Sequence, residues 1–164
     1  MEKHTISVLV NDEPGVLARV ANLFGRRGFN IDSITVGASE EKGLSRMIIV
    51  TTGDEKTTEQ VMKQLHKLID VIKVQLLSHA PMVAREIILL KVDAGPSTRS
   101  EISGIVEPFR ASIVDVGPQS MIVQATGDSE KIDALTELLR PYGIRELSRT
   151  GITAMSRGVV AAKV

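Results

Sequence analysis

Side chains that commonly carry catalysis or bind metals are few and scattered in this chain of 164 residues. There is no cysteine, which excludes thiolate nucleophiles, thiolate metal sites and disulfides. The three histidines, His4, His66 and His79, are spaced so that no two of them could form a metal-binding pair on one helix face. Neither Ser45 nor Ser148 lies in a Gly-x-Ser-x-Gly motif. We therefore expect no catalytic residues and no metal site.

One loop could bind an anion. Residues 93–98, Asp-Ala-Gly-Pro-Ser-Thr, precede a predicted helix, and the free N–H groups at a helix start favour negative charge. The segment lacks the lysine and the spacing of a phosphate-binding loop, so we do not expect phosphate to bind there.

A more informative pattern combines the loop at 11–15, Asn-Asp-Glu-Pro-Gly, with an asparagine further along the chain, Asn30. The loop precedes a predicted helix whose first N–H groups favour a carboxylate, and Gly15 lets the backbone approach a ligand closely. Because an asparagine side chain both donates and accepts, Asn11 and Asn30 could bind the ammonium and carboxylate groups of a free amino acid. The apolar residues that would line such a pocket are Val16, Leu17 and Ile31.

The two parts of this pattern belong to opposite ends of the predicted helix, so one chain alone separates Asn11 from Asn30. A dimer could bring them together. A simpler interpretation is that Asn11 and Asp12 only cap the helix and that Asn30 only begins a strand. The residue types alone leave both interpretations open.

Composition narrows the possible partners and the location. Twenty basic residues balance twenty acidic ones, so no net charge attracts nucleic acid or an anionic membrane, and we expect neither as a partner. The first ten residues do not resemble a secretory leader, and no apolar run approaches the roughly 20 residues of a membrane span. We therefore expect a cytoplasmic protein whose cores consist of aliphatic side chains.

Apolar periodicity predicts the order β-α-β-β-α-β in the first half of the chain. Thr57 and Gln60 resemble a capping box at the start of the second helix. Ile48 and Val50 alternate with Met47, which leaves apolar residues on both faces of the sheet and predicts dimerisation through the sheet or its edge strands. The predicted strands and helices cover 6–10, 16–28, 30–36, 46–52, 57–69 and 71–77.

The same order repeats in the second half of the chain, which makes the expected fold α+β with two tandem ferredoxin-like βαββαβ domains. We place the domains at 1–78 and 79–158, with a tail at 159–164. The whole stretch from Gly151 onward lacks periodicity and is expected to be mobile or bound to a partner. The predicted strands and helices cover 86–92, 98–109, 111–116, 120–126, 128–139 and 144–147.

The first half resembles the ACT domain of the acetolactate synthase small-subunit family. The resemblance lies in NDEPGVLARV at 11–20, LF at 23–24 and RGFNIDSI at 27–34, and it continues through 44–47, 52–54 and 64–71. It extends into the second half at 85–87, 109–111, 149–151 and 156–158. Nearly the whole chain is therefore similar to this family.

This resemblance implies a dimer of ACT domains that binds valine, or a related branched-chain amino acid, at the subunit interface. Asn11, Gly15, Val16 and Leu17 would come from one chain, and Asn30 and Ile31 from the other. It also implies that the chain activates and feedback-inhibits a catalytic large subunit, with thiamine diphosphate, Mg and FAD in that subunit and no cofactor in this chain. Pro14 and Ala18 depart from the pattern of several relatives and could alter effector affinity.

Two alternatives from other classes are open. A tandem ACT protein could sense an amino acid and regulate a different enzyme or a transcriptional system. An acylphosphatase-like enzyme shares the ferredoxin-like layout, but it needs an arginine in the first loop to hold phosphate. Here that loop contains Asp12 and Glu13 instead, which argues against phosphate chemistry.

Overall fold

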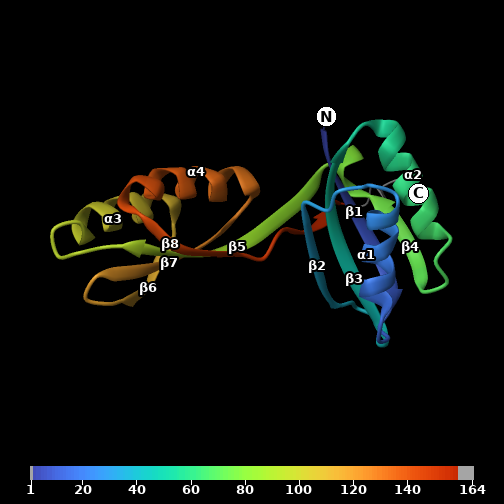
Figure 1. The fold of residues 1–164 in the computed structure, drawn as a ribbon, viewed down its shortest axis with the longest axis horizontal. Coiled ribbons are helices and arrows are strands. Elements are labelled where there is room, and N and C mark those ends of the chain that lie inside the picture. Colours follow the sequence, from blue (N-terminus) through green and yellow to red (C-terminus); the bar gives the residue numbers. More distant parts are fainter. Residues whose placement is uncertain (1, 159–164) are drawn as a thin grey trace. The chain divides into compact units, whose positions relative to one another are not determined.

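The computed structural model describes residues 2–158, which divide into two compact units (Figure 1). The N-terminal unit comprises the chain up to Val83 together with the segment that begins at Thr153, and the C-terminal unit comprises Ala84–Ile152. Each unit has its own hydrophobic core. Among the described residues, no helix is both long enough and apolar enough to cross a membrane.

The N-terminal unit has the predicted order β-α-β-β-α-β. Its antiparallel sheet has the strand order β2-β3-β1-β4, so the first strand lies inside the sheet and β2 and β4 form its edges. Figure 1 shows α1 and α2 on one face of this sheet. The elements are β1 (Glu2–Asn11), α1 (Val16–Arg26), β2 (Ser33–Ala38), β3 (Leu44–Gly53), α2 (Glu55–His66), β4 (Val71–Leu76) and a short 3-10 helix η1 (Leu77–His79).

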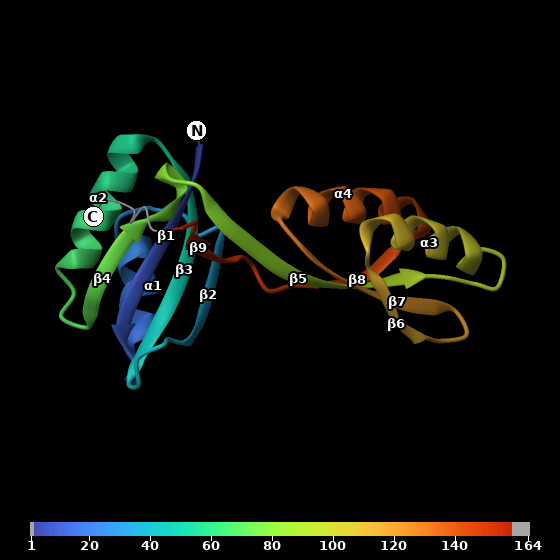
Figure 2. The same ribbon diagram turned by 180° about the vertical axis from the view of Figure 1, so that it is seen from behind.

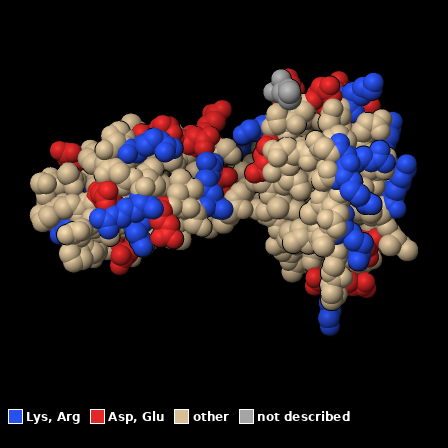
Figure 3. All heavy atoms as spheres, in the orientation of Figure 1, with Lys and Arg blue, Asp and Glu red and all other residues tan. Residues whose placement is uncertain are grey.

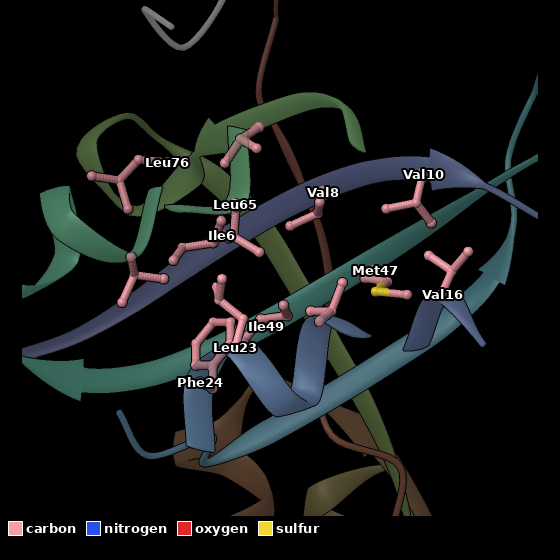
Figure 4. Close-up of a cluster of buried hydrophobic side chains, with 13 residues drawn as sticks. Ile6, Val8, Val10, Val16, Leu23, Phe24, Met47, Ile49, Leu65 and Leu76 are labelled. Atoms are coloured by element: carbon pink, nitrogen blue, oxygen red, sulfur yellow. The ribbon is translucent and has the colours of Figure 1, made fainter. Parts of the chain in front are cut away.

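Side-chain periodicity explains why these segments form these elements. Every second residue of β1 points toward the helices, and α1 packs its apolar stripe against them, including the fully buried Phe24. Figure 4 shows this core between the sheet and the helices. The second helix begins differently from our prediction: Asp54, not Thr57, is the N-cap, and its carboxylate accepts the backbone N–H of Thr57 at 2.7 Å.

The opposite face of the N-terminal sheet is already covered within one chain. Ile48 and Val50 point away from the helices, yet they are only 2% and 8% exposed. Figure 2 shows strand β9 (Thr153–Ser156) against this sheet, with α1 on the other side. The apolar residues on this face therefore do not need a second copy of the chain to bury them.

The C-terminal unit repeats the order β-α-β-β-α-β, with the strand order β6-β7-β5-β8 and two helices packed against one face. Its α4 is capped by Asp128, whose carboxylate accepts the N–H of Lys131 at 2.9 Å. The elements are β5 (Met82–Asp93), α3 (Arg99–Val106), η2 (Glu107–Phe109), β6 (Ser112–Val116), β7 (Ser120–Gly127), α4 (Ser129–Leu139), η3 (Arg140–Tyr142) and β8 (Ile144–Arg149).

The segment after Gly151 differs from our expectation of a mobile or partner-bound tail. Thr153–Ser156 forms β9, which pairs with β5 and buries Ala154 at 7% exposure. Just beyond the strand, the N–H of Arg157 donates to the carbonyl of Pro81 at 2.8 Å. Backbone pairing orders this segment, and four residues are too few to show a strand period in the sequence. The predicted tail at 159–164 lies outside the described residues.

Candidate functional site

The loop at residues 11–15 leaves the start of α1 without a side-chain cap. The N-cap is Gly15, which has φ 86°, a left-handed conformation that glycine adopts readily. Neither Asn11 nor Asp12 makes a capping hydrogen bond, so the capping interpretation of these residues is wrong. Within residues 2–158, the N–H groups of Leu17 and Ala18 donate to no protein acceptor. These two donors are therefore available to an external carboxylate.

Backbone hydrogen bonds fix the start of this loop to two neighbouring segments. The N–H of Asn11 donates to the carbonyl of Asp70 at 2.9 Å, and the N–H of Asp12 donates to the carbonyl of Gly43 at 2.9 Å. The half-buried side-chain amide of Asn11 makes no hydrogen bond with any described residue. Asn11 is thus held by its backbone, and its side chain is free to contact a ligand.

Sequence reasoning missed an ion pair beside this loop. Arg19 Nε donates to Asp70 Oδ2 at 2.7 Å, and the side chain of Asp70 is only 10% exposed. The same arginine lies close to Gly15, because a Cβ added to that glycine would sit 3.1 Å from Arg19 Nη1. The pair therefore links α1, the loop and the start of β4. Arg19 and Asp70 are 51 residues apart, and no spacing rule connects them.

Val16 and Leu17 have different surroundings, although they are adjacent. The Val16 side chain is 3% exposed and lies in the core, near Val10 and Met47 (Figure 4). The Leu17 side chain is 47% exposed. Val16 can therefore contribute only backbone groups to a ligand, whereas Leu17 can contribute apolar surface.

Asn30 and Ile31 precede the second strand and do not belong to it, because β2 begins at Ser33. Asn30 is exposed, and its Nδ2 donates to Asp32 Oδ1 at 2.7 Å. Its carbonyl accepts Thr51 Oγ1 at 2.6 Å, which fixes the backbone on β3. Ile31 packs partly against the core. The amide oxygen of Asn30 is thus oriented by Asp32, a neighbour to which the sequence had given no role.

The structure does not bring Asn30 next to Asn11 within one chain. The two residues flank opposite ends of α1, whose 11 residues give it a length of about 16 Å. No group of three or more His, Asp or Glu side chains that could hold a metal occurs within residues 2–158. What this region offers is backbone donors, amide side chains and an exposed leucine, which are groups suited to binding a small zwitterion.

Two family models match the chain and together span most of it. Residues 6–73 match the model described as an AHAS small subunit-like ACT domain. Residues 85–158 match the model described as the small subunit of acetolactate synthase. The first match contains all six candidate residues, and the second covers most of the C-terminal unit.

Individual relatives agree with these matches. The chain is 52% identical to the acetolactate synthase small subunits of Bacillus subtilis and of Mycolicibacterium smegmatis, over 95% and 94% of its length and 91% of each relative. A crystal structure of the acetolactate synthase small subunit from Thermotoga maritima matches with a TM-score of 0.89 at 46% identity, covering 98% of this chain and 100% of that one. The chain therefore belongs to the acetolactate synthase small-subunit family.

Proposed function

We propose that this protein is the regulatory subunit of acetolactate synthase, which activates the catalytic subunit and confers feedback inhibition by valine. Membership of the small-subunit family supports this role. The chemistry belongs to the catalytic subunit, which would hold thiamine diphosphate, Mg and FAD, and this chain would carry no cofactor. The cytoplasm is the proposed location.

The observation that carries the valine site is the position of the first loop relative to the edge strand β2. Ala38, at the end of β2, pairs with Ser45, and the adjoining turn holds Asp12 through the carbonyl of Gly43. The loop that contains Asn11 therefore lies at the same end of the sheet as the end of β2. Asn30 lies at the other end, just before β2 begins.

Antiparallel pairing of two β2 strands from two chains would join these ends. The start of one β2 would then lie alongside the end of the other, because antiparallel strands run in opposite directions. Asn30 and Ile31 of one chain would thus approach the loop of its partner. The position of β2 at the edge of the sheet supports this arrangement, and the covered outer face of the sheet favours edge pairing over face-to-face packing.

Each composite site would hold one amino acid by complementary contacts. From one chain, Asn11, the backbone of Gly15 and Val16, and Leu17 would contact the ligand. From the other chain, Asn30 and Ile31 would contact it. Two charge-assisted hydrogen bonds would contribute roughly 1.5–3 kcal/mol each, and burial of an aliphatic side chain adds to them. After the cost of ordering the ligand and the loop is subtracted, the binding free energy is about 4–8 kcal/mol in favour of the complex. That range corresponds to micromolar to millimolar binding, which suits a metabolite sensor.

Inhibition requires valine to bind two states unequally. A ligand that bridges two chains favours the dimer arrangement in which both halves of the site meet, and the proposal is that this arrangement lowers the activity of the catalytic subunit. We assign sensing to the domain at 1–78. The domain at 79–158 is proposed to help engage or stabilise the catalytic subunit.

Acetolactate formation by the catalytic subunit of the same organism tests this function. The rate should rise when the protein is added and fall again as valine is titrated. If the rate does not change at any ratio of the two proteins, this catalytic partner is wrong. Valine binding in the absence of any rate effect would favour a sensor of a different enzyme or transcriptional system.

A further inference from the structure

The helical face of the N-terminal unit is basic, although the chain as a whole carries no net charge. Residues 16–27 include three arginines and no acid, and residues 63–73 include three lysines and a single acid, Asp70. That acid is largely buried and already paired with Arg19. Figure 3 shows Lys and Arg side chains gathering over α1 and α2 on this face. These two segments therefore carry six cationic side chains against one acid, which is paired with Arg19.

A hollow lies within this basic face, and we call it the basic hollow. Its volume is about 590 Å³ and it is open to solvent. Small residues and one aliphatic side chain line it together with two arginines and an amide. The lining residues are Arg19, Ala21, Asn22, Gly25, Arg26 and Leu68. Such a lining suits an aliphatic side chain flanked by carboxylates.

Two exposed aliphatic side chains follow Leu68 closely in the sequence. Next to Leu68, Ile69 is 92% exposed, which makes it the most exposed large hydrophobic residue among those described. Ile72 is 54% exposed and lies beside Lys73 on the edge strand β4. Aliphatic residues that are this exposed among cations are typical of a contact surface.

We propose that the basic hollow docks an acidic amphipathic segment of the catalytic subunit. This inference rests on the proposed function, because it assumes that a catalytic partner exists. An aliphatic side chain of that segment fills the space over Ala21, Gly25 and Leu68, and its carboxylates contact Arg26 and the neighbouring lysines. Charge complementarity of this kind determines the association rate and partner choice.

A protein segment fits this surface better than a nucleic acid does. The apolar lining of the hollow is aliphatic, and its lining residues include no aromatic side chain for base stacking. Arg19 of the hollow also supports the candidate site, because it pairs with Asp70, whose carbonyl accepts the N–H of Asn11. Docking at the hollow is therefore connected to the effector loop through the Arg19–Asp70 ion pair and the hydrogen bond between Asp70 and Asn11.

The test measures binding of the full chain to the catalytic subunit for two variants of the hollow. Arg26→Glu reverses a charge in the lining of the hollow. Gly25→Leu adds a bulky side chain to the lining, at a position where an added Cβ would have no neighbour within 4 Å. Lys42→Glu, in the turn between β2 and β3, is the matched control for the same charge change elsewhere. Circular dichroism checks that each variant is folded.

We expect each hollow variant to weaken binding by about tenfold at low salt, and Lys42→Glu to leave it within about twofold. The affinity of the wild-type protein should fall more steeply with salt than that of Arg26→Glu. Valine affinity of the isolated protein should be the same in all four proteins, since these substitutions lie outside the proposed effector contacts.

Wild-type affinity in both hollow variants would overturn the docking proposal alone. Failure of the wild-type protein to bind the catalytic subunit would overturn both the proposed function and the docking. A labelled single-stranded oligonucleotide tests the alternative partner. If it binds as tightly as the catalytic subunit, and Arg26→Glu abolishes that binding, the hollow binds a nucleic acid and the docking proposal is wrong.

Discussion

In both units the same backbone hydrogen bonds hold the loop after the first strand, but some charged side chains in and beside that loop differ between the units. In both units the last residue of the first strand donates its N–H to a carbonyl before the last strand: Asn11 to Asp70 at 2.9 Å, and Asp93 to Gly143 at 2.8 Å. The next residue of each loop is held by a hairpin carbonyl, that of Gly43 in one unit and Gln119 in the other. The backbone arrangement is therefore repeated.

The side chains at these equivalent positions are not repeated. Asn11 is neutral and its side chain makes no hydrogen bond with any residue within 2–158, whereas Asp93 is charged and paired with Arg145. The first turn of α1 contains no acid, whereas that of α3 contains Glu101, whose carboxylate accepts the hydroxyl of Tyr142 at 3.0 Å. Negative charge beside the start of α3 disfavours a ligand carboxylate. Asp12 and Glu13 also lie in the N-terminal loop, so the contrast concerns two positions: that of Asn11 or Asp93, and the first turn of the following helix. The comparison teaches that one shared backbone arrangement can carry different charges at these two positions.

Introducing an acid at Gly15 should have the largest effect on this difference. Gly15→Asp places a carboxylate at the N-cap and a Cβ at φ 86°, 3.1 Å from Arg19 Nη1. We expect valine affinity, measured by calorimetry on the isolated protein, to fall by about a hundredfold or more. Gly95→Asp in the C-terminal loop is the matched control and should leave valine affinity unchanged. Equal losses in both variants would contradict the comparison.

Asn11 allows a graded version of the same test. Asn11→Ala removes one hydrogen-bonding group and should weaken valine binding by about tenfold. Asn11→Asp copies the charge found at Asp93 and should weaken it further, because two carboxylates would then face each other. An Asp variant that binds as well as the Ala variant would show that charge is not what separates the two loops.

The ion pairs beside the two loops should differ in their contribution to stability. Arg19→Ala leaves the 10%-exposed carboxylate of Asp70 without its cation and should cost about 1–3 kcal/mol. Arg145→Ala releases Asp93, which is 47% exposed, and should cost less than about 1 kcal/mol. Urea unfolding, followed by circular dichroism, measures both. Arg19→Ala should also weaken valine binding, whereas Arg145→Ala should not.

The smallest difference is expected at the second helices, where the two units are alike. Asp54 and Asp128 both cap a helix, so Asp54→Ala and Asp128→Ala should lower the stability of their units by similar amounts.

Hydrogen bonds from the side chain and backbone of Thr57 lower the pKa of Asp54 from its ordinary value of 3.8. The contribution of this cap is therefore fully present above pH 3.8 and is lost as pH falls through the lowered pKa. Thermal melts across that range check the sign.

Much of the fold could be predicted because it depends on local periodicity. Both β-α-β-β-α-β units, and with them the α+β class, follow from apolar spacing, and the structure and its match to a solved small subunit confirm them. A capping-box pattern favours Thr57 as the cap of α2, but the helix begins earlier, and Asp54 accepts the N–H of Thr57 in its first turn. β9 was missed because its order comes from pairing with β5, which is distant in sequence.

The candidate site could be predicted only as a set of residue types. Asn11, Gly15 and Asn30 follow from their chemistry and from the family resemblance, and their role in binding stays a prediction. The burial of Val16 in the core and the link from Arg19 to Asp70 depend on three-dimensional packing. No local pattern could have indicated either of them.

A dimer that combines two inactive variants tests the composite site most directly. Neither Asn11→Ala nor Asn30→Ala homodimers would contain an intact site. In a heterodimer with one chain of each kind, purified with two different affinity tags, one of the two sites would hold both wild-type asparagines. The account predicts that the heterodimer binds one valine with wild-type affinity. A heterodimer that binds valine no better than either homodimer would contradict a site shared between two chains.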